Sequence, residues 1–150
     1  MSRQTSIARA LTDSTIPCGI RRTNRPPCPE DLKPQFPIVR EAAESLNLAV
    51  LEKAGVEADD IIATLAKDYS KKGFEVTIVS SDKDLMQLID DKVTMYDAMK
   101  NKIVDEAGVL EKFNVGPDRV LDVLSLMGDA SDNVPGVRGI GPKTAAELIN

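Results

Sequence analysis

Apolar residues recur along the chain with two different periods, and each period predicts a type of element. Helical spacing appears after Pro37 and again over Glu57–Lys72, where Gly73 supplies a helix stop. Between these two helices, the short apolar run "LAVLE" is typical of a buried strand. The run "FEVTIVS" predicts a second buried strand, and "DKDLMQLI" begins a short helix directly after it.

The later part of the chain changes from strands to helices. "VTMYDA" and "KIVD" flank Met99–Asn101 and predict a hairpin or strand pair. From Glu106 onward the spacing is helical through "EAGVLEKF" and "PDRVLDVLSLMG", and Pro117 is well placed in the first turn of the second helix. Strands that alternate with helices predict an α/β fold, with a mostly parallel, Rossmann-like sheet under helical cover and an all-helical extension after it.

The N-terminal part of the chain predicts little regular structure. Residues 1–23 show no clear period, and five prolines within Asn24–Pro37 exclude a long helix there. The chain has 150 residues, of which 42% are hydrophobic and 3% aromatic, so it can bury one core that must be aliphatic.

Charge is segregated along the chain, although the net charge of −5 argues against a uniformly basic surface. Residues 57–91 carry nine Asp and Glu against four Lys and Arg, while residues 1–40 carry seven Lys and Arg against three acids. This separation fits a metal site beside a phosphate-binding arm.

Composition excludes several function classes. Cys18 and Cys28 lack CxxC spacing and the chain has no His, so a zinc site, a Cys–His nucleophile and a disulfide framework have no support. No apolar run approaches membrane-spanning length, and the polar N-terminus lacks the apolar core of a signal peptide. We expect a cytoplasmic protein with no membrane partner.

Carboxylates follow both predicted strands. "VTIVSSDKD" brings Asp82 and Asp84 to the end of one strand, and "GVEADD" brings Glu57, Asp59 and Asp60 to the start of the helix after the other. Ligands of an open parallel sheet bind outside the carboxyl ends of its strands, so neighbouring strands would gather all five acids at one edge.

A metal explains the two acidic groups better than helix capping does. Capping and the helix dipole account for any single acid at a helix N-terminus. Two crowded groups, however, repel each other unless a cation intervenes. Oxygen-only ligands select hard cations such as Mg²⁺ or Mn²⁺, and a pair of such ions serves phosphoryl transfer.

A glycine-rich turn follows a third acidic pair, Asp129 and Asp132, in "MGDASDNVPGVRGIGPKTAAELI". The turn follows a helix and lacks a Gly-Lys-Ser/Thr ending, so it is neither a dinucleotide-binding turn nor a P-loop. Its exposed N–H groups and the positive end of the next helix can hold a phosphodiester, with Arg138 and Lys143 adding charge. A plain interhelical turn with a glycine cap explains the composition equally well.

In order along the chain, "GVEADDIIATLA", "VTIVSSDKDLMQL" and the glycine-rich segment resemble the 5′-nuclease (5′–3′ exonuclease) domain of bacterial DNA polymerase I, a member of the flap endonuclease superfamily. The resemblance runs from near Asn24, where "NRPPCPEDL" is similar to the family's arch region, to Asn150. It implies a PIN-like nuclease core with an arch remnant over 24–105 and a helical segment with a partial helix–three-turn–helix motif over 106–150. Residues 1–23 would be a divergent arm.

The resemblance implies a two-metal enzyme that cuts DNA, or RNA primers on DNA, from a 5′ end or flap in replication and repair. Mg²⁺ or Mn²⁺ would act in cleavage, and K⁺ could bind at the hairpin. A polymerase domain could belong to the full-length protein, which we expect to be a monomer associated with the nucleoid. By motif, the metal ligands are Glu57, Asp59, Asp60, Asp82, Asp84, Asp129 and Asp132, and Asp82, Asp84 and Arg22 are the catalytic residues. The DNA-binding residues are Arg22, Arg25, Gly136, Arg138, Gly139, Gly141, Lys143 and Thr144.

The chain departs from the family pattern at both ends. Residues 1–23 resemble neither of the two early strands that carry further aspartates, and Asp13 lies in no strand pattern. At "RRTNR", Arg22 could replace the charge of a family lysine, whereas Arg21 cannot replace the ring of a family tyrosine. The chain also stops within the second helix of the hairpin motif. We therefore expect a truncated domain with weak or absent cleavage and partial metal binding.

Two alternatives remain open at this point. In the first, the chain is a non-catalytic duplex-DNA-binding fragment that acts through its hairpin. In the second, "SSDKD" is the Asp-x-Asp of a haloacid-dehalogenase-like phosphatase, although Met86 stands where that motif normally has Thr or Val.

Overall fold

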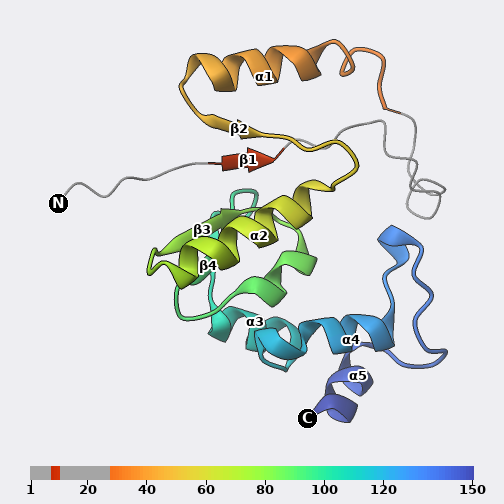
Figure 1. Cartoon of the computed structure of the whole chain (residues 1–150). Helices are drawn as coiled ribbons and strands as arrows, with labels where there is room; N and C mark the ends of the chain where they lie inside the picture. The colour runs from red at the N-terminus through yellow and green to blue at the C-terminus, as the bar shows by residue number, and fades with distance from the viewer. Residues whose placement is uncertain (1–7, 11–27) are drawn as a thin grey trace. The chain divides into compact units, whose positions relative to one another are not determined.

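The computed structural model of the chain describes residues 8–10 and 28–150, which fall into two compact units, Met1–Ile61 and Ile62–Asn150 (Figure 1). In the first unit, strand β1 (Ala8–Ala10) pairs in parallel with strand β2 (Ala49–Leu51), and helix α1 (Gln35–Ser45) precedes β2. The pattern of residues 1–23 predicted no element, so β1 is an addition to the expected fold.

Helix α1 begins before the proline that was expected to precede it. Pro37 lies in the first turn of α1, where its missing N–H costs no helical hydrogen bond. None of the residues of α1 is buried, and both Ile38 in the helix and Leu46 at its C-cap are exposed. The strand expected at "LAVLE" is present as β2, which pairs with β1 among the described strands, but Ala49 and Leu51 at its ends are exposed.

Helix α2 (Ala58–Lys71) agrees with the predicted amphipathic segment. Asp59 and Asp60 lie in its first turn and Lys71 in its last, as the helix dipole favours. Gly73 then adopts a φ of +87°, which ends the helix at the predicted position. Ala66 is buried and Ile62 packs against the core of the second unit, where α2 lies across the sheet in Figure 1.

The sheet of the second unit has the order β3–β4–β5. Strand β3 (Val76–Val79) pairs in parallel with β4 (Val93–Asp97), and β4 pairs antiparallel with β5 (Lys102–Val104) to form the predicted hairpin. Short 3₁₀ helix η1 (Lys83–Leu88) follows β3, where a short helix was expected. Within the described residues, β1 and β2 of the first unit pair with each other and β3, β4 and β5 of the second unit form their own sheet, so the joining of all strands into one sheet stays a prediction.

Cross-strand rows show which face of this sheet is covered. Ile78, Met95 and Val104 lie in register and are all buried in the core. The adjacent row on the other face contains Val79, which is 62% exposed, and Ile103. The expectation that "FEVTIVS" is a buried strand therefore holds for one face of β3, where Ile78 is buried, and not for the other, where Val79 is exposed.

The helical extension completes the core. Its elements are α3 (Glu106–Phe113), η2 (Pro117–Arg119), α4 (Val120–Met127), η3 (Ala130–Asp132) and α5 (Pro142–Ile149). Pro117 stands at the start of η2, as predicted. Val109, Val120 and Val123 are completely buried, and Ala145 and Ala146 of α5 join the same cluster. In the described residues, every helix is too short or too polar to span a lipid bilayer.

Candidate metal centre and nucleic-acid interface

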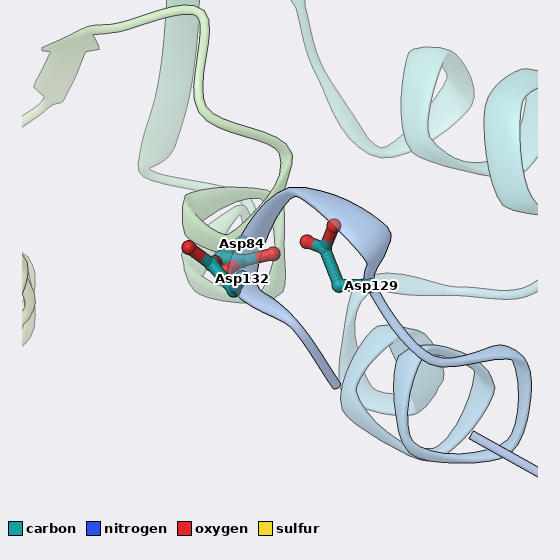
Figure 2. Close-up of side chains that lie close together, drawn as sticks. All are labelled: Asp84, Asp129 and Asp132. Carbon is teal, nitrogen blue, oxygen red and sulfur yellow. The ribbon is translucent and has the colours of Figure 1, made fainter. Parts of the chain in front are cut away.

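Three of the predicted ligands meet in the second unit. One carboxylate oxygen from each of Asp84, Asp129 and Asp132 lies within 4.8 Å of the other two. Figure 2 shows Asp84 on the η1 ribbon and the other two aspartates on the segment around η3. We call this group the acidic trio. It joins acids from two distant parts of the sequence.

The strand-end motif places Asp84 through its neighbour Asp82. Oδ1 of Asp82 accepts a hydrogen bond of 3.0 Å from the backbone N–H of Asp84, which makes Asp82 the N-cap of η1. Leu85 and Met86 of the same short helix are buried, so η1 is fixed to the core. Asp82 itself is exposed and is not part of the acidic trio.

The other two acids lie on a loop that is closed by backbone contacts. The backbone N–H of each of Asp129 and Val134 donates to the carbonyl oxygen of the other, both at 2.8 Å. Oδ1 of Asp129 accepts from the N–H of Ser131 at 2.8 Å and caps η3. Two glycines seal the base of this loop, since a Cβ on Gly128 would lie 2.5 Å from the carbonyl oxygen of Val134 and one on Gly136 would lie 2.5 Å from the nitrogen of Gly128.

Lys83 forms an ion pair with one carboxylate of the acidic trio. Its Nζ lies 2.8 Å from Oδ2 of Asp129, and the two side chains are 29% and 13% exposed. The analysis of the sequence missed both Lys83 and Gly128. Two positions in the sequence could have indicated them. Lys83 stands between Asp82 and Asp84, and Gly128 directly precedes Asp129.

Charges within the trio are unevenly compensated. The hydrogen bond from Lys83 lowers the pKa of Asp129, and the N–H of Ser131 lowers it further. Burial raises the pKa of Asp84, and the negative charges of Asp82 and Asp129 raise it further. The hydrogen bond to Asp129 raises the pKa of Lys83. Lys83 therefore stabilises the ionised form of Asp129. The surroundings of Asp84 remain negative, so its ionised form is disfavoured.

The remaining predicted site residues lie elsewhere. Glu57, Asp59 and Asp60 belong to the first unit, at and just before the start of α2, and their convergence with the trio stays a prediction. Arg22 and Arg25 lie outside the described residues, so their predicted roles in catalysis and DNA binding stay predictions too.

The glycine hairpin connects α4 to α5 and follows the acidic loop directly. Gly139 has a φ of +83°, and the N–H of Ile140 donates to the carbonyl of Val137 at 3.0 Å, which turns the chain tightly. Gly141 precedes Pro142, the first residue of α5. Arg138, Lys143 and Thr144 are all exposed around this turn. Exposed N–H groups, a helix N-terminus and two basic side chains are features that suit a phosphodiester.

The donor set of the trio fits a hard divalent cation. All three donors are carboxylate oxygens, which Mg²⁺ and Mn²⁺ prefer, and the excess negative charge at Asp84 favours a cation. Fold and site together define a class of protein, namely an α/β domain with a carboxylate cluster beyond its strand ends and a helical domain with a glycine hairpin.

Comparison with known families identifies the group within this class. Residues 21–114 match the family described as "5′–3′ exonuclease, N-terminal resolvase-like domain", and residues 115–150 match "5′–3′ exonuclease, C-terminal SAM fold". The chain belongs to the 5′–3′ exonuclease family. The resemblance and the fold class predicted from the sequence are thereby confirmed.

Curated relatives carry corresponding names. The chain is 52% identical over 128 residues to DNA polymerase I of Rhizobium leguminosarum, and this match covers 85% of the chain and 13% of the relative. It is 43% identical over 128 residues to the 5′–3′ exonuclease of Aquifex aeolicus, covering 85% of the chain and 44% of the relative. The chain thus spans less than half the length of either relative.

A solved structure of similar fold contains DNA. The chain matches the bacteriophage T5 D15 flap endonuclease, in a complex with DNA and metal ions, with a TM-score of 0.69 and 28% identity. The match covers 76% of this chain and 43% of the phage protein.

Proposed function

We propose that the chain is the metal-binding and DNA-binding part of a 5′–3′ exonuclease or flap endonuclease, which hydrolyses phosphodiesters of DNA. The observation that carries this proposal is the approach of Asp84, Asp129 and Asp132 to within 4.8 Å. The names of the relatives and the metal ions and DNA of the T5 complex support it.

Asp84, Asp129 and Asp132 would hold Mg²⁺ or Mn²⁺, with Asp82 beside them and with Glu57, Asp59 and Asp60 as further predicted ligands. When bound, such an ion stabilises the negative charge that develops on a phosphodiester during hydrolysis. The carboxylates would fix the position of the cation, and Lys83, 2.8 Å from Asp129, balances part of the negative charge of the trio.

The glycine hairpin would bind the DNA backbone at a point distant from the cleaved bond. Gly136, Gly139 and Gly141 allow the backbone to approach a phosphate, while Arg138, Lys143 and Thr144 surround the turn. K⁺ at the same turn, and Arg22 and Arg25 at the arch, are further parts of this proposal. The DNA would present a 5′ end or flap, or an RNA primer on DNA.

The wider setting of the chain is likewise proposed. The matched part of the Rhizobium relative is 13% of a DNA polymerase I, which supports an attached polymerase domain. We propose a monomer that acts on DNA in the cytoplasm, at the nucleoid. The division into an arm over 1–23, a core over 24–105 and a helical segment over 106–150 is proposed on the same basis.

A cleavage assay with binding measured in parallel tests the nuclease. A 5′-flap DNA is incubated with the chain in Mn²⁺, and binding of the same DNA is measured in EDTA. We expect slow, Mn²⁺-dependent release of the flap, lost in Asp84→Asn and in Asp132→Asn, whereas both variants still bind the DNA.

Asp68→Asn is the matched control, because Asp68 is an exposed acid of α2 outside the acidic trio. This variant should cut as the unchanged chain does. Cleavage that persists in Asp84→Asn, or that proceeds equally in EDTA, would contradict the proposed role of the trio.

The second candidate is a module that binds duplex DNA without cutting it. The separate placement of the glycine hairpin on α4 and α5 favours this candidate, since the hairpin needs none of the acids to reach a phosphate. Flap binding in EDTA without any release in Mn²⁺ would decide for the module and against the nuclease.

A further inference from the structure

A cavity of about 290 Å³ opens between η1, the β4–β5 hairpin and α3. This volume is large enough for a phosphate group together with water. The charged residues of its wall are three lysines and two acids: Lys100, Lys102, Lys112, Asp97 and Glu111. We call it the lysine cavity.

Two of the three lysines are neutralised by acids of the same wall. Nζ of Lys100 lies 3.1 Å from Asp97, and Nζ of Lys102 lies 3.1 Å from Glu111. In the described part of the chain, no carboxylate lies within 4.0 Å of the ammonium of Lys112, which is 5.4 Å from the centre of the Phe113 ring. The cavity therefore has one positive charge in excess.

The surroundings of Lys112 are also positive. Burial lowers the pKa of Lys112, and the positive charges of Lys100 and Lys83 lower it further, against the weaker opposite effect of Asp97 and Asp82. A cation that is disfavoured by neighbouring cations is stabilised when an anion binds beside it.

The lysine cavity lies at the sheet edge that carries the acidic trio. The N–H of Ser80, after β3, donates to the carbonyl of Tyr96 at 3.1 Å, so the carboxyl ends of parallel β3 and β4 lie side by side. Asp97 of the cavity ends β4, and Asp82 follows β3. Met86 in the cavity wall belongs to η1, the short helix that carries Asp84.

We propose that the lysine cavity is a second phosphate site, in which Lys112 binds a backbone phosphate of the DNA strand whose neighbouring phosphate reaches the acidic trio. This inference rests on the proposed nuclease function. Lysine recognises phosphate as a point charge, and the described residues that line the cavity include no aromatic ring on which a base could stack. A strand backbone therefore suits the cavity better than a nucleotide does.

Salt dependence of DNA binding tests the site. The affinity for a 5′-flap DNA is measured in EDTA from 50 to 200 mM KCl for the unchanged chain, for Lys112→Met and for Lys112→Arg. Loss of one phosphate contact should weaken binding roughly threefold to tenfold and reduce the slope of log K against log[KCl] by about 0.7 to 0.9. Lys112→Arg should retain both, because the charge remains.

Lys67→Met is the matched control, since Lys67 is an exposed lysine of α2 that does not line the cavity. It should leave the affinity and the slope unchanged. Equal slopes for the unchanged chain and Lys112→Met would overturn the proposal, as would an equal change in Lys67→Met. If flap cleavage in Mn²⁺ is present while Lys112→Met binds normally, only this inference fails. If cleavage is absent while the slope changes as expected, the nuclease fails and the phosphate site stands.

Inorganic phosphate distinguishes a strand site from a site for small anions. Phosphate is titrated into the chain while the ε-methylene NMR signal of Lys112 is followed. A saturable shift that DNA competes away supports the proposal. A saturable shift that DNA does not affect assigns the cavity to a small phosphate and overturns the DNA contact.

Discussion

Replacing Lys83 with methionine should lower the stability of the fold and raise the affinity of the acidic trio for a divalent cation. The variant keeps the length of the side chain and removes the ammonium that lies 2.8 Å from Asp129. A hydrogen bond between charged groups contributes about 1.5–3 kcal/mol when it is well shielded from water. Because Lys83 is 29% exposed and Asp129 is 13% exposed, we discount this range to about 1–2 kcal/mol.

Urea unfolding at pH 7 measures the effect directly. In EDTA, Lys83→Met should lower the free energy of unfolding by about 1–2 kcal/mol, since Asp129 loses its counter-charge. In Mn²⁺ this loss of stability should become smaller. A divalent ion no longer competes with the ammonium, so Lys83→Met should bind Mn²⁺ roughly fivefold more tightly, equivalent to about 1 kcal/mol.

Lys102→Met is the control for this experiment. Its ion pair with Glu111 has a similar distance, 3.1 Å, but both side chains are more than half exposed, at 57% and 74%. Its loss should change the free energy of unfolding by less than about 0.5 kcal/mol in either buffer. If Lys83→Met and Lys102→Met lower the free energy of unfolding equally in EDTA, the ion pair at the trio stabilises the fold no more than an exposed pair does, and the reasoning is refuted.

Three further predictions test the loop, the charge balance and the hairpin. Gly128→Ala should destabilise the protein by more than about 2 kcal/mol in urea unfolding, because its new Cβ would meet backbone at 2.5 Å, whereas Gly73→Ala, also at positive φ but with open space around it, should cost only about 1 kcal/mol. Equal losses of stability in the two variants would show that the positive φ, and not the contact of the new Cβ with the backbone, causes the destabilisation. Asp84→Asn should stabilise the metal-free protein at pH 7 by less than about 1 kcal/mol, because its raised pKa makes the ionised carboxylate unfavourable in the folded state. This advantage should fade as the pH falls through the folded pKa towards the ordinary value of 3.8, where the carboxyl group is protonated in both states, and a gain that persists at pH 3 would contradict it. Lys143→Met should reduce the salt slope of flap binding by about 0.7 to 0.9 and should add to Lys112→Met, as for two independent phosphates; a double variant no weaker than either single variant would disprove their independence.

Local signals in the sequence were sufficient for most elements of the second unit. Period and helix-stop residues predicted α2 with Gly73, and the Met99–Asn101 turn predicted the β4–β5 hairpin. The burial of the strands was not predictable in the same way. An apolar run such as "VTIV" has the same composition whether one face or both faces are covered, and here Val79 lies on the open face.

For the site, the sequence identified the acids but not the contacts between them. Asp84, Asp129 and Asp132 were selected because they follow strand ends or precede a glycine turn, and the structure brings them together. The interactions of Lys83 and Gly128 depend on segments that are distant along the chain or on backbone closure, which no local pattern encodes. Asp82 was expected to coordinate a metal, and in the structure its carboxylate caps η1.

The two segments that carry the acidic trio are attached to one hydrophobic core, and this has a consequence for metal binding. Leu85 and Met86 fix η1, and Val123 fixes α4, from which the Asp129 loop emerges, within the same buried cluster. The loop itself is closed by the contact of Gly128 with Gly136. The acids are thus brought together by apolar packing and backbone closure, against their mutual repulsion. A cation then removes a repulsion that the fold already sustains. Divalent binding should therefore raise the stability of the folded state, as an increase in the urea midpoint on addition of Mn²⁺ would show.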